Sequence, residues 1–441
     1  MIATSYPRFP GDTVGTFMEP IAHGVAARGH AVHLVLPWHP KLQRPAREGG
    51  VFFYPFHYAP VPSVNVFGYA EGMRADVRLR WQAFVAAPLA LAAGWRMARR
   101  VARAVGATVM HGHWVIPGGA IAATATRDLP LVISLHGSDV YVAERHAIAG
   151  RVARHAFARA EWVTACSADL RQRALALGAE DARSEVVPYG VDAERFRPDP
   201  AVRAEVRAGL GIDDATPVVF TAGRFVRKKG FEYLIDAVAR LSASAGARGV
   251  DSARRAESTD AADATSRAAS ASPAPTPADL VLIIGGDGDL RDELAARARD
   301  AGLASRIRFV GLLSQDAVAR HLAAADVAVV PSVRDDSGNV DGLPNVVLES
   351  LASGTPLVAT PAGGIGAAVV HERTGLLVPE RDADALAAAI AALIDSPPRR
   401  RVLGEAARAD VIARFGWPRV AERFEAAYTA ARAQRAARDR K

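Results

Sequence analysis

Short apolar runs alternate with Ala-, Arg- and Leu-rich stretches of helical pattern along most of the chain, and the alternation occurs twice. In the first half, the apolar runs predict strands at Ala31–Leu36, Ala107–His111, Leu131–Leu135, Trp162–Ala165 and Glu185–Val187. In the second half, they predict strands at Val218–Ala222, Leu280–Gly285, Ile307–Val310, Val327–Val330, Pro356–Ala359 and Gly375–Val378. Strands that alternate with helices are typical of βα units around a parallel sheet. We therefore predict an α/β protein with two Rossmann-like domains.

The connection between the two predicted domains lies in Pro188–Pro200, so we expect a first domain of residues 1–195 and a second of residues 196–416. Helices are expected between several of the strands, at Phe17–Arg28, Phe231–Leu241 and Leu290–Ala301. Residues 417–441 form a polar, Arg-rich stretch with Phe424 and Tyr428 at i, i+4 spacing. This spacing predicts a final helix outside the second domain.

Residues 242–279 interrupt the alternation, because they are rich in Ala, Ser, Pro and charge and hold almost no large apolar residue. Such a composition predicts disorder. The segment separates the helix Phe231–Leu241 from the strand Leu280–Gly285, where a short turn would serve. We interpret it as a tolerated surface insertion, with a regulatory role as the alternative.

A chain of 441 residues is longer than a domain with one hydrophobic core usually is, which again predicts two domains. Half of the residues are hydrophobic, enough to fill both cores. The single cysteine, Cys166, excludes an intramolecular disulfide and fits a reducing cytosol. A small buried thiol is the interpretation we prefer over a nucleophile. The sequence starts with no basic and apolar leader, so secretion is not expected. Met1–Ser5 resembles the end of a strand whose opening residues lie upstream.

Basic residues outnumber acidic residues by 54 to 47, and the excess is uneven. Residues 74–103 contain seven Arg and one Asp together with several aromatic and aliphatic side chains. Two interpretations stay open: a helix that contacts an anionic membrane surface, or a pair of domain helices with solvated arginines. The apolar run Phe84–Trp95 has 12 residues and includes Pro88 and Gly94, which is too short and too interrupted to span a bilayer. No nucleic-acid partner is expected.

The stretch from Asp341 to Thr360 contains two carboxylates near the predicted start of a helix. Asp341 comes just before the start, and Glu349 lies within the helix. Leu343, Pro344 and Asn345 are typical of a helix N-terminus, and Gly354 predicts its end. Free N–H groups at such a start bind anions, and the two acids can accept hydrogen bonds from hydroxyls. A ligand with phosphates and hydroxyls is the interpretation we prefer over an ordinary capped core helix.

This stretch resembles the retaining glycosyltransferases of the GT-B fold, family-4 type, whose signature is E-x(7)-E within EGxPxxxxE. The spacing matches, but the first acid is Asp341 instead of Glu. The resemblance implies two Rossmann-like domains that face each other across a cleft, and a C-terminal helix that returns to the first domain. It assigns Asp341 to the donor sugar, Gly342, Leu343, Pro344 and Asn345 to the diphosphate, and Glu349 to the ribose. The side chain of Asp341 is one methylene shorter than the Glu of the motif, so the positioning of the donor sugar is where this chain departs from the family.

A basic loop follows the predicted strand Val218–Ala222 and precedes a helix, an arrangement that suits phosphate binding. In the family, this loop supplies an Arg and a Lys to the donor diphosphate, which match Arg224 and Lys229 after Gly223. Two cations there would stabilise the charge that develops as the bond to phosphate breaks. Another glycine-rich turn, Gly285–Gly288, matches the family's turn near the nucleotide at Gly286, although a tight βα corner explains it equally well.

Histidines close two predicted strands of the first domain. His136 and Asp139 match the family's HGxD element, which faces the donor's anomeric carbon. His111 and His113 match an H-x-H-W element, and we expect them to shape the acceptor side together with Asp139. Their spacing would suit a metal, but no Cys or carboxylate cluster accompanies them, so no metal site is predicted. Gly15, in a loop that lacks the family's adjacent glycine pair, is the best match for a backbone approach to phosphate or acceptor.

The resemblance predicts an enzyme that moves a hexose from a UDP- or GDP-linked sugar to a hydroxyl of a carbohydrate or lipid-linked acceptor, with retention and without a further cofactor. Cytoplasmic assembly of a surface polysaccharide or glycolipid is its usual setting, at the inner face of the membrane where the acceptor is a lipid. Two alternatives stay open: a sugar-nucleotide 2-epimerase of similar plan, and a non-catalytic nucleotide-sugar binder.

Overall fold

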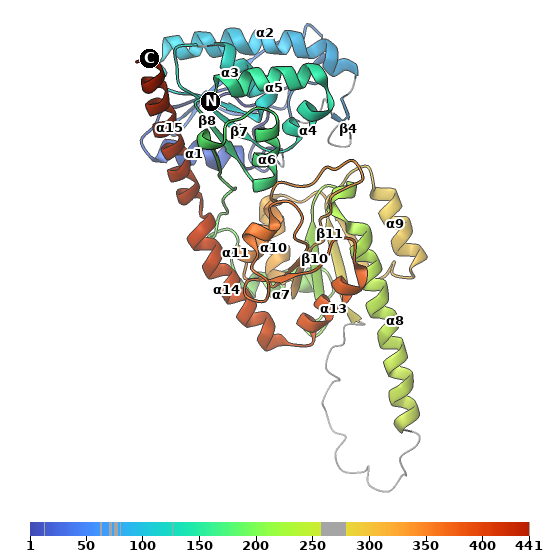
Figure 1. Cartoon of the computed structure of the whole chain (residues 1–441). Coiled ribbons are helices and arrows are strands. Elements are labelled where there is room, and N and C mark those ends of the chain that lie inside the picture. Colours follow the sequence, from blue (N-terminus) through green and yellow to red (C-terminus); the bar gives the residue numbers. More distant parts are fainter. Residues whose placement is uncertain are drawn as a thin grey trace. The chain divides into compact units, whose positions relative to one another are not determined.

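The computed structural model describes residues 1–440 except 13, 62–63, 70–72, 75–77, 80, 126 and 257–278. It divides the chain into two compact units (Figure 1). The first comprises Met1–Val191, Asp341–Leu343 and Arg414–Lys441, and the second comprises Asp192–Val340 and Pro344–Ala413. The predicted boundaries, after residues 195 and 416, fall a few positions later in the sequence. The three residues Asp341–Leu343 belong to the first unit although both neighbouring segments belong to the second.

The second unit contains a sheet of six parallel strands in the order β12-β11-β10-β13-β14-β15. The strands are β10 (Val218–Ala222), β11 (Val281–Gly285), β12 (Ile307–Gly311), β13 (Val327–Val330), β14 (Leu357–Ala359) and β15 (Leu376–Leu377). Nearly continuous apolar runs suit strands that are covered on both faces, and β10, β11 and β13 are almost completely buried. The chain runs outward from β10 in one direction and then, from β13, in the other, which is the doubly wound order of a Rossmann fold.

Helices surround this sheet and begin at residues suited to that position. They are α7 (Pro200–Gly209), α8 (Phe231–Ala256), α9 (Arg291–Asp300), α10 (Gln315–Ala324), α11 (Asn345–Ala352), α12 (Ile365–Ala368), α13 (Ala383–Ile394) and α14 (Pro397–Phe415). The side chains of Asp199, Ser314 and Asp382 each accept a hydrogen bond from a backbone N–H of the helix that follows. The apolar sides of α8, α9 and α13 complete the core with the strands.

The first unit contains two short sheets, β1-β3-β2 and β6-β7-β8-β9, which are linked through one residue, Ile2. The strands are β1 (Val32–Pro37), β2 (Arg47–Glu48), β3 (Val51–Phe56), β6 (Met110–His113), β7 (Leu131–Leu135), β8 (Trp162–Ala165) and β9 (Ser184–Val186), with a separate hairpin of β4 (Met73–Arg74) and β5 (Arg78–Leu79). All strand pairs are parallel except β2 with β3 and β4 with β5.

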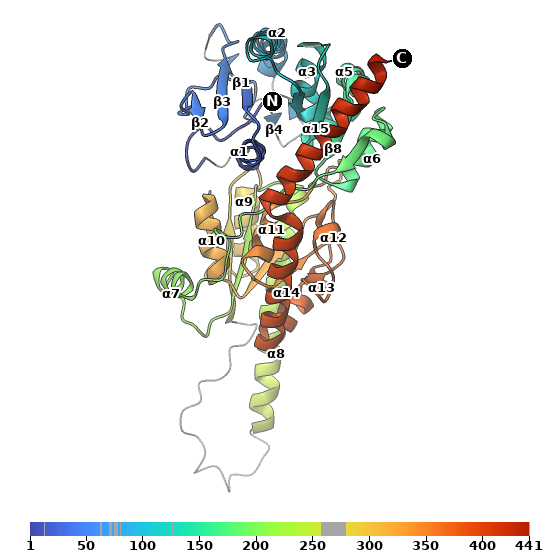
Figure 2. The same cartoon turned by 90° about the vertical axis from the view of Figure 1, so that its left-hand side faces the viewer.

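The helices of the first unit are α1 (Met18–Ala27), α2 (Trp81–Ala104), α3 (Ala120–Ala125), α4 (Ser138–Arg145), α5 (Ala147–Arg159), α6 (Ala168–Ala176) and α15 (Trp417–Asp439). The last of these lies beside α1, as Figures 1 and 2 show, and buries Val420, Phe424 and Tyr428 in the core of this unit. The predicted return of the C-terminal helix to the first domain is therefore confirmed, as is the α/β class with two Rossmann-like domains.

The structure differs from the secondary structure expected from sequence in three places. Strand β3 was not predicted, although Val51–Phe56 is a continuous apolar run that pairs with β1 along six residues. Residues 74–103 do not form two helices, because α2 continues through Pro88 and Gly94 as one helix. The helix α8 does not end at Leu241 but continues to Ala256, into the segment predicted to be disordered (Figure 2). Ala and Arg are strong helix formers, which explains the extension. The rest of that segment, from residue 257 to 278, lies outside the described residues.

Within the described residues, every helix is either too short or too polar to cross a bilayer.

Candidate functional site

Sheet topology alone marks one place in the second unit where a ligand is expected. The strand order reverses between β10 and β13, and ligands of doubly wound sheets bind beyond the carboxyl ends of the strands at that reversal. Strand β10 leads into Gly223–Gly230, and β13 leads into Pro331 and Ser332. The basic loop that the sequence singled out therefore lies at the topological switch point.

The loop after β10 packs tightly on the segment after β13. Gly230 has a φ of +64°, and an added Cβ would lie 2.0 Å from the carbonyl oxygen of Pro331. The N–H of Val333 donates to the carbonyl of Lys228 at 2.9 Å. Because Gly230 combines a left-handed backbone with this contact, a side chain there would force the two segments apart. The close fit fixes the position of the basic loop.

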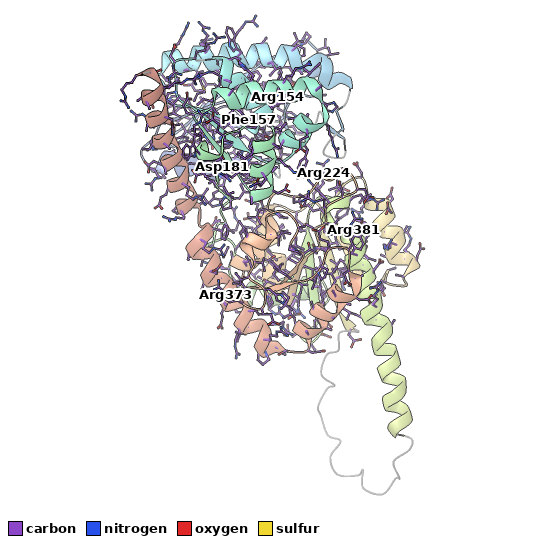
Figure 3. All side chains as sticks on the ribbon, in the orientation of Figure 1. Arg154, Phe157, Asp181, Arg224, Arg373 and Arg381 are labelled. Carbon is purple, nitrogen blue, oxygen red and sulfur yellow. The ribbon has the colours of Figure 1, made fainter. Side chains whose placement is uncertain are left out.

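The two cations of this loop differ in exposure. Arg224 is exposed on the loop (Figure 3), whereas Lys229 is half-buried and lies along Gly223, whose added Cβ would be 3.3 Å from Lys229 Cε. The N–H of Gly223 donates to the carbonyl of Gly285, and the N–H of Phe225 donates to that of Asp287. The basic loop is thus tied to the glycine-rich turn after β11.

That turn approaches the basic loop through Gly286, which has a φ of +135°. An added Cβ would lie 1.9 Å from the carbonyl oxygen of Gly223, so no other residue fits without moving the loop. Gly286 therefore has a clear packing role, which was the alternative interpretation of its motif. The same packing places the turn beside Gly223 and hence next to the proposed phosphate loop.

Helix α11 begins at Asn345, with Pro344 as its N-cap, and Gly354 follows its last turn with a φ of +66°. The start and end match the prediction from sequence. The first N–H groups of a helix have no partner within it, so those of Asn345 and Val346 form an electropositive end that suits an anion.

Glu349 lies within α11 and is 8 % exposed. Burial raises the pKa of its carboxyl to about 7, and the positive charges of Arg195 and Lys229 act against that rise. The carboxylate and Lys229 are therefore close enough to interact electrostatically. Arg195 was not predicted, because nothing in its local sequence connects a residue so far from α11 with that helix.

The two acids of the motif are assigned to different compact units. Asp341, Gly342 and Leu343 belong to the first unit, whereas Pro344, Asn345 and Glu349 belong to the second. An added Cβ on Gly342 would lie 2.7 Å from Cys166 Sγ, and the charge of Asp341 contributes to the raised pKa of that thiol. Cys166 is buried and its pKa is raised to about 12, chiefly by burial, which fits the inert thiol that we expected.

His136 lies at the carboxyl end of β7 with both ring nitrogens in hydrogen bonds. Its Nε2 is 3.0 Å from His113 Nδ1, and its Nδ1 is 3.0 Å from the hydroxyl of Tyr189. Burial lowers the pKa of His136 to about 3, so the imidazole is neutral at physiological pH. Phe17 and Trp114 contact the ring at 4.8 Å between centroids. Tyr189 was not predicted as a partner, because it lies on the segment after β9.

One placement of the ring protons satisfies the hydrogen bonds among His113, His136 and Tyr189 at the lowest cost in free energy. The Nε2 of His113 is buried with no hydrogen-bond partner among the described residues. A buried acceptor nitrogen without a hydrogen-bond partner costs less free energy than a buried N–H without one. We therefore place the proton of His113 on Nδ1, from which it donates to His136. His136 then carries its proton on Nδ1 and donates to Tyr189.

The remaining first-domain candidates are buried supports. His111 is 2 % exposed and shares hydrogen bonds of 2.8 Å with the hydroxyl of Tyr428 and 2.7 Å with that of Ser134. Asp139 accepts hydrogen bonds from the N–H groups of Val115 and Gly137 at 2.7 and 3.0 Å, which ties the H-x-H-W loop to the HGSD loop. Burial raises the pKa of Asp139 to about 6. Asp139 therefore positions two stretches of backbone, whereas His111 connects the side chains of β7 and α15.

Gly15 packs against the backbone of Ser5 and Tyr6. It has a φ of +65°, and an added Cβ would lie 3.2 Å from the backbone of Ser5 and Tyr6. A glycine suits this position, because the backbone is left-handed and a side chain would press on Ser5 and Tyr6.

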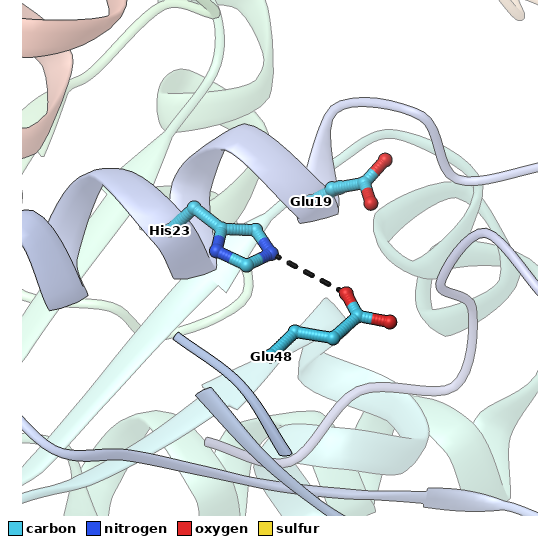
Figure 4. Close-up of side chains that lie close together, drawn as sticks. All are labelled: Glu19, His23 and Glu48. Carbon is cyan, nitrogen blue, oxygen red and sulfur yellow. Dashed lines mark ion pairs between the residues drawn. The ribbon is translucent and has the colours of Figure 1, made fainter. Parts of the chain in front are cut away.

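One cluster of the described residues has ligand atoms close enough for a metal ion: Glu19 and His23 of α1 with Glu48 of β2 (Figure 4). Arg44 already supplies the positive charge there, because its NH1 is 2.7 Å from Glu19 and 3.0 Å from Glu48. We interpret the cluster as an ion-pair network.

Two family models match this chain in the two units. The model described as Glycosyltransferase Family 4 matches residues 14–195, and the model described as Glycosyl transferases group 1 matches residues 216–396.

Curated relatives agree with the family models. A GDP-mannose-dependent alpha-(1-6)-phosphatidylinositol monomannoside mannosyltransferase of Mycobacterium tuberculosis is 32% identical over 263 residues, 59% of this chain and 60% of the relative. A D-inositol 3-phosphate glycosyltransferase of Kineococcus radiotolerans is 32% identical over 352 residues, 75% of this chain and 73% of the relative. The chain thus spans about 60% of the length of the mannosyltransferases it matches.

Solved structures resemble the whole chain. HepE of Anabaena, in complex with UDP and glucose, has a TM-score of 0.68 at 20% identity and covers 95% of this chain and 97% of its own. The sucrose-phosphate synthase of Thermosynechococcus elongatus has a TM-score of 0.69 at 22% identity and covers 94% and 92%. These similarities establish the fold.

Proposed function

Because this chain belongs to the glycosyltransferases that join a family 4 domain to a group 1 domain, we propose that it moves a hexose from a nucleotide diphosphate sugar to a hydroxyl group with retention of configuration. The observation that supports the proposal best is the arrangement in the second unit. Lys229 of the basic loop lies at the topological switch point and acts electrostatically on Glu349 of α11.

The donor diphosphate is assigned to Arg224, Lys229 and the first N–H groups of α11. The bond between the sugar and the diphosphate breaks during transfer, and negative charge develops on the departing phosphate. Groups that are fixed in place before the reaction stabilise that charge without reorganisation. The packing of Gly230 on Pro331 and of Gly286 on Gly223 holds the loop in this way. Both cations therefore favour the transition state over the bound donor.

Glu349 is assigned to the ribose hydroxyls and Asp341 to the hydroxyls of the donor sugar. The carboxylate form of Glu349 accepts two hydrogen bonds, and ionisation of this buried acid is favoured by Lys229 and Arg195. The assignment of Asp341 rests on its place in the motif, eight residues before Glu349 in the sequence.

His136 is assigned to the surroundings of the reacting carbon, on the basis of the HGSD motif. Its ring nitrogens are held by His113 and Tyr189, so the residue offers a neutral, fixed surface and not a mobile base. We therefore assign the acceptor's proton to an oxygen of the departing phosphate. The new bond joins the acceptor oxygen to the anomeric carbon on the face that the phosphate leaves. No protein nucleophile and no resident cofactor enter this scheme.

The names of the relatives suggest where to look for substrates. Several are described as GDP-mannose-dependent mannosyltransferases of phosphatidylinositol monomannoside, and others act as D-inositol 3-phosphate glycosyltransferases. We propose GDP-mannose as the first donor to test and inositol-bearing glycolipids or phosphates as the first acceptors. Such an acceptor fits a place in glycolipid or polysaccharide assembly.

A thermal-shift panel of UDP-, GDP- and ADP-sugars tests the donor, and a radiolabelled donor tests the reaction. We expect a matching donor at 100 times its Kd to stabilise the protein by about 3 kcal/mol. The radiolabelled sugar should leave that donor quickly only when an acceptor is present. Interconversion of the donor sugar without acceptor would identify an epimerase, and stabilisation with neither transfer nor slow hydrolysis would identify a binder.

A lipid-linked acceptor agrees with the surface of α2, for which we propose contact with an anionic membrane. Val85 and Leu89 are 50% and 43% exposed, and Arg96, Arg100 and Arg103 follow at helical spacing on the exposed side. Apolar side chains can enter the headgroup region while arginines pair with anionic lipids.

Flotation with phosphatidylglycerol vesicles measures this contact. The triple variant Arg96→Glu, Arg100→Glu and Arg103→Glu should lose vesicle binding, while the control Arg401→Glu on α14 should retain it. Equal binding of both variants would exclude α2 as the contact surface.

A further inference from the structure

Several arginines of the first unit gather around one buried carboxylate, that of Glu161. This residue directly precedes β8 and is 1 % exposed, and its Oε2 accepts a hydrogen bond of 2.7 Å from the N–H of Leu131, the first residue of β7. Because β7 and β8 are parallel, Glu161 lies at their amino ends, whereas His136 follows the carboxyl end of β7. Nothing in the proposed sugar transfer uses this edge of the sheet.

The arginines come from three separate segments. Arg159 is the last residue of α5, Arg435 and Arg438 lie in the last two turns of α15, and Arg127 follows α3. A nitrogen of Arg159, of Arg435 and of Arg438 lies 3.7, 3.8 and 3.9 Å from Glu161 Oε1, respectively. These distances are longer than a hydrogen bond. Oε1 is buried and has no hydrogen-bond partner among the described residues. We call these four residues the arginine cluster.

The arginine cluster has a fixed base and an exposed side. The backbone carbonyl of Arg127 accepts hydrogen bonds from Arg159 at 3.0 Å and from Arg435 at 2.8 Å, which holds both guanidiniums in place. The Nε of Arg159 is buried and donates to none of the described residues. Arg438 is 55 % exposed, and Arg127 is exposed as well. The cluster therefore has donors directed outward that the described part of the chain leaves available.

Positive charge exceeds negative charge at this place. Arg435 also pairs with Asp439 at 3.0 Å, but Asp128 forms no ion pair with the cluster within the described part of the chain. Burial lowers the pKa of the Arg159 guanidinium, and the other three arginines lower it further against the opposing charge of Glu161. Like charges so close together repel each other. A bound anion would relieve this repulsion.

We propose that the arginine cluster binds a phosphate group, with Arg127 and Arg438 donating from the exposed side and Arg159 from the base. Guanidinium groups match phosphate oxygens in pairs, and the charge of about −2 on a phosphate monoester balances the excess of arginines. Glu161 lies beneath the guanidiniums and leaves the exposed side to donors. The phosphate belongs to a soluble phosphate ester or to a lipid headgroup, and the site is separate from the donor site proposed in the second unit.

The double variant Arg127→Gln with Arg438→Gln tests the proposal in the whole chain, because exposed side chains can be replaced without disturbing the core. The control, Arg151→Gln with Arg154→Gln, removes two exposed charges from α5. Inorganic phosphate at constant ionic strength is the first probe, and the rise of the Tm with its concentration gives the Kd. The Kd should rise about 10-fold or more in the double variant and less than about twofold in the control.

The donor loop is the same in all three forms, so phosphate bound there contributes equally. Flotation with phosphatidylcholine vesicles that contain phosphatidic acid is the second probe, because phosphatidic acid carries a phosphate monoester. Weaker binding of the double variant to both probes assigns the phosphate to a lipid headgroup. Weaker binding to inorganic phosphate alone assigns it to a soluble ester.

Equal binding of the double variant and the control to both probes would overturn the proposal, and an equal loss in both would reduce it to an effect of net charge. The Tm measured without phosphate separates a structural role. A lower Tm of the double variant, with its Kd for phosphate unchanged, would show that the arginines serve only Glu161.

Discussion

The Lys229→Ala variant should turn over its donor about 100- to 1,000-fold more slowly than the native chain, and Arg224→Ala should show a loss of similar size. The reason is that the departing diphosphate becomes more negative as its bond to the sugar breaks. A cation that is already in place stabilises the transition state more than the bound donor. The loss should therefore appear in kcat, with a smaller change in KM, in steady-state assays of sugar transfer.

Arg227→Ala provides the matched control, since it removes one positive charge from the same loop. Both terminal nitrogens of the Arg227 guanidinium donate to the carboxylate oxygens of Glu293 at 2.6 Å, and the side chain is half-exposed. Its removal should change kcat less than about threefold, because an exposed ion pair contributes little. If Arg227→Ala slowed transfer as much as Lys229→Ala, net charge of the loop would explain the effect, and the specific roles of Arg224 and Lys229 would fail.

The Glu349→Ala variant should bind the nucleotide sugar about 10- to 100-fold more weakly, because hydrogen bonds between the buried carboxylate and ribose hydroxyls are lost. Titration calorimetry with the donor, or with the free nucleotide diphosphate, measures the change. Glu349→Gln keeps the size of the side chain but cannot ionise, so it should also bind weakly. Unchanged affinity in both variants would remove Glu349 from the donor site.

The pH dependence of unfolding separates this role from a structural one. The pKa of Glu349 is about 7 in the folded chain against an ordinary value of 4.5, so the folded state holds the proton more tightly than the unfolded state. Its contribution to stability is then complete below pH 4.5 and is lost as the pH rises through 7. Glu349→Gln should lose less stability over that range. A variant that binds donor poorly but is at least as stable above pH 7 is folded, and its defect lies in binding.

Much of the fold could be predicted from sequence because the central strands are buried on both faces. The runs Leu131–Leu135, Val218–Ala222 and Val327–Val330 are almost wholly apolar, and each is a strand with the predicted ends. Strand β3 was missed because it contains Pro55, which argues against a strand in sequence. The length of α8 was missed because low hydrophobicity predicts disorder, whereas Ala and Arg favour a helix wherever no proline intervenes.

The candidate site could be predicted only as far as motifs identify it. Gly223, Lys229, Gly286 and Glu349 were named from their match to the family's motifs. The structure places the first three on adjoining loops after β10 and β11, and Glu349 within α11, while their roles stay predictions. Partners that come from distant segments could not be found this way. Tyr189, which holds His136, and Arg195, which acts on Glu349, carry no local signal.

The motif did not reveal which residues of the first domain are exposed. His111, His113 and Asp139 resemble site residues in sequence, and the structure buries all three side chains. The two histidines bond to other side chains, and Asp139 accepts hydrogen bonds from two loop N–H groups. Burial depends on residues far away, such as Tyr428 of α15, whose hydroxyl meets His111. The family and the enzyme class were predicted correctly, whereas the roles of individual site residues and retention of configuration stay predictions.

A crystal structure of the chain with a bound nucleotide diphosphate tests the central claim most directly, that the second unit holds the donor by its diphosphate at the end of β10 and α11. The account predicts the distal phosphate within hydrogen-bond distance of Arg224, Lys229 and a backbone N–H of Asn345 or Val346, and the ribose hydroxyls on Glu349. A nucleotide bound away from these four groups would contradict it.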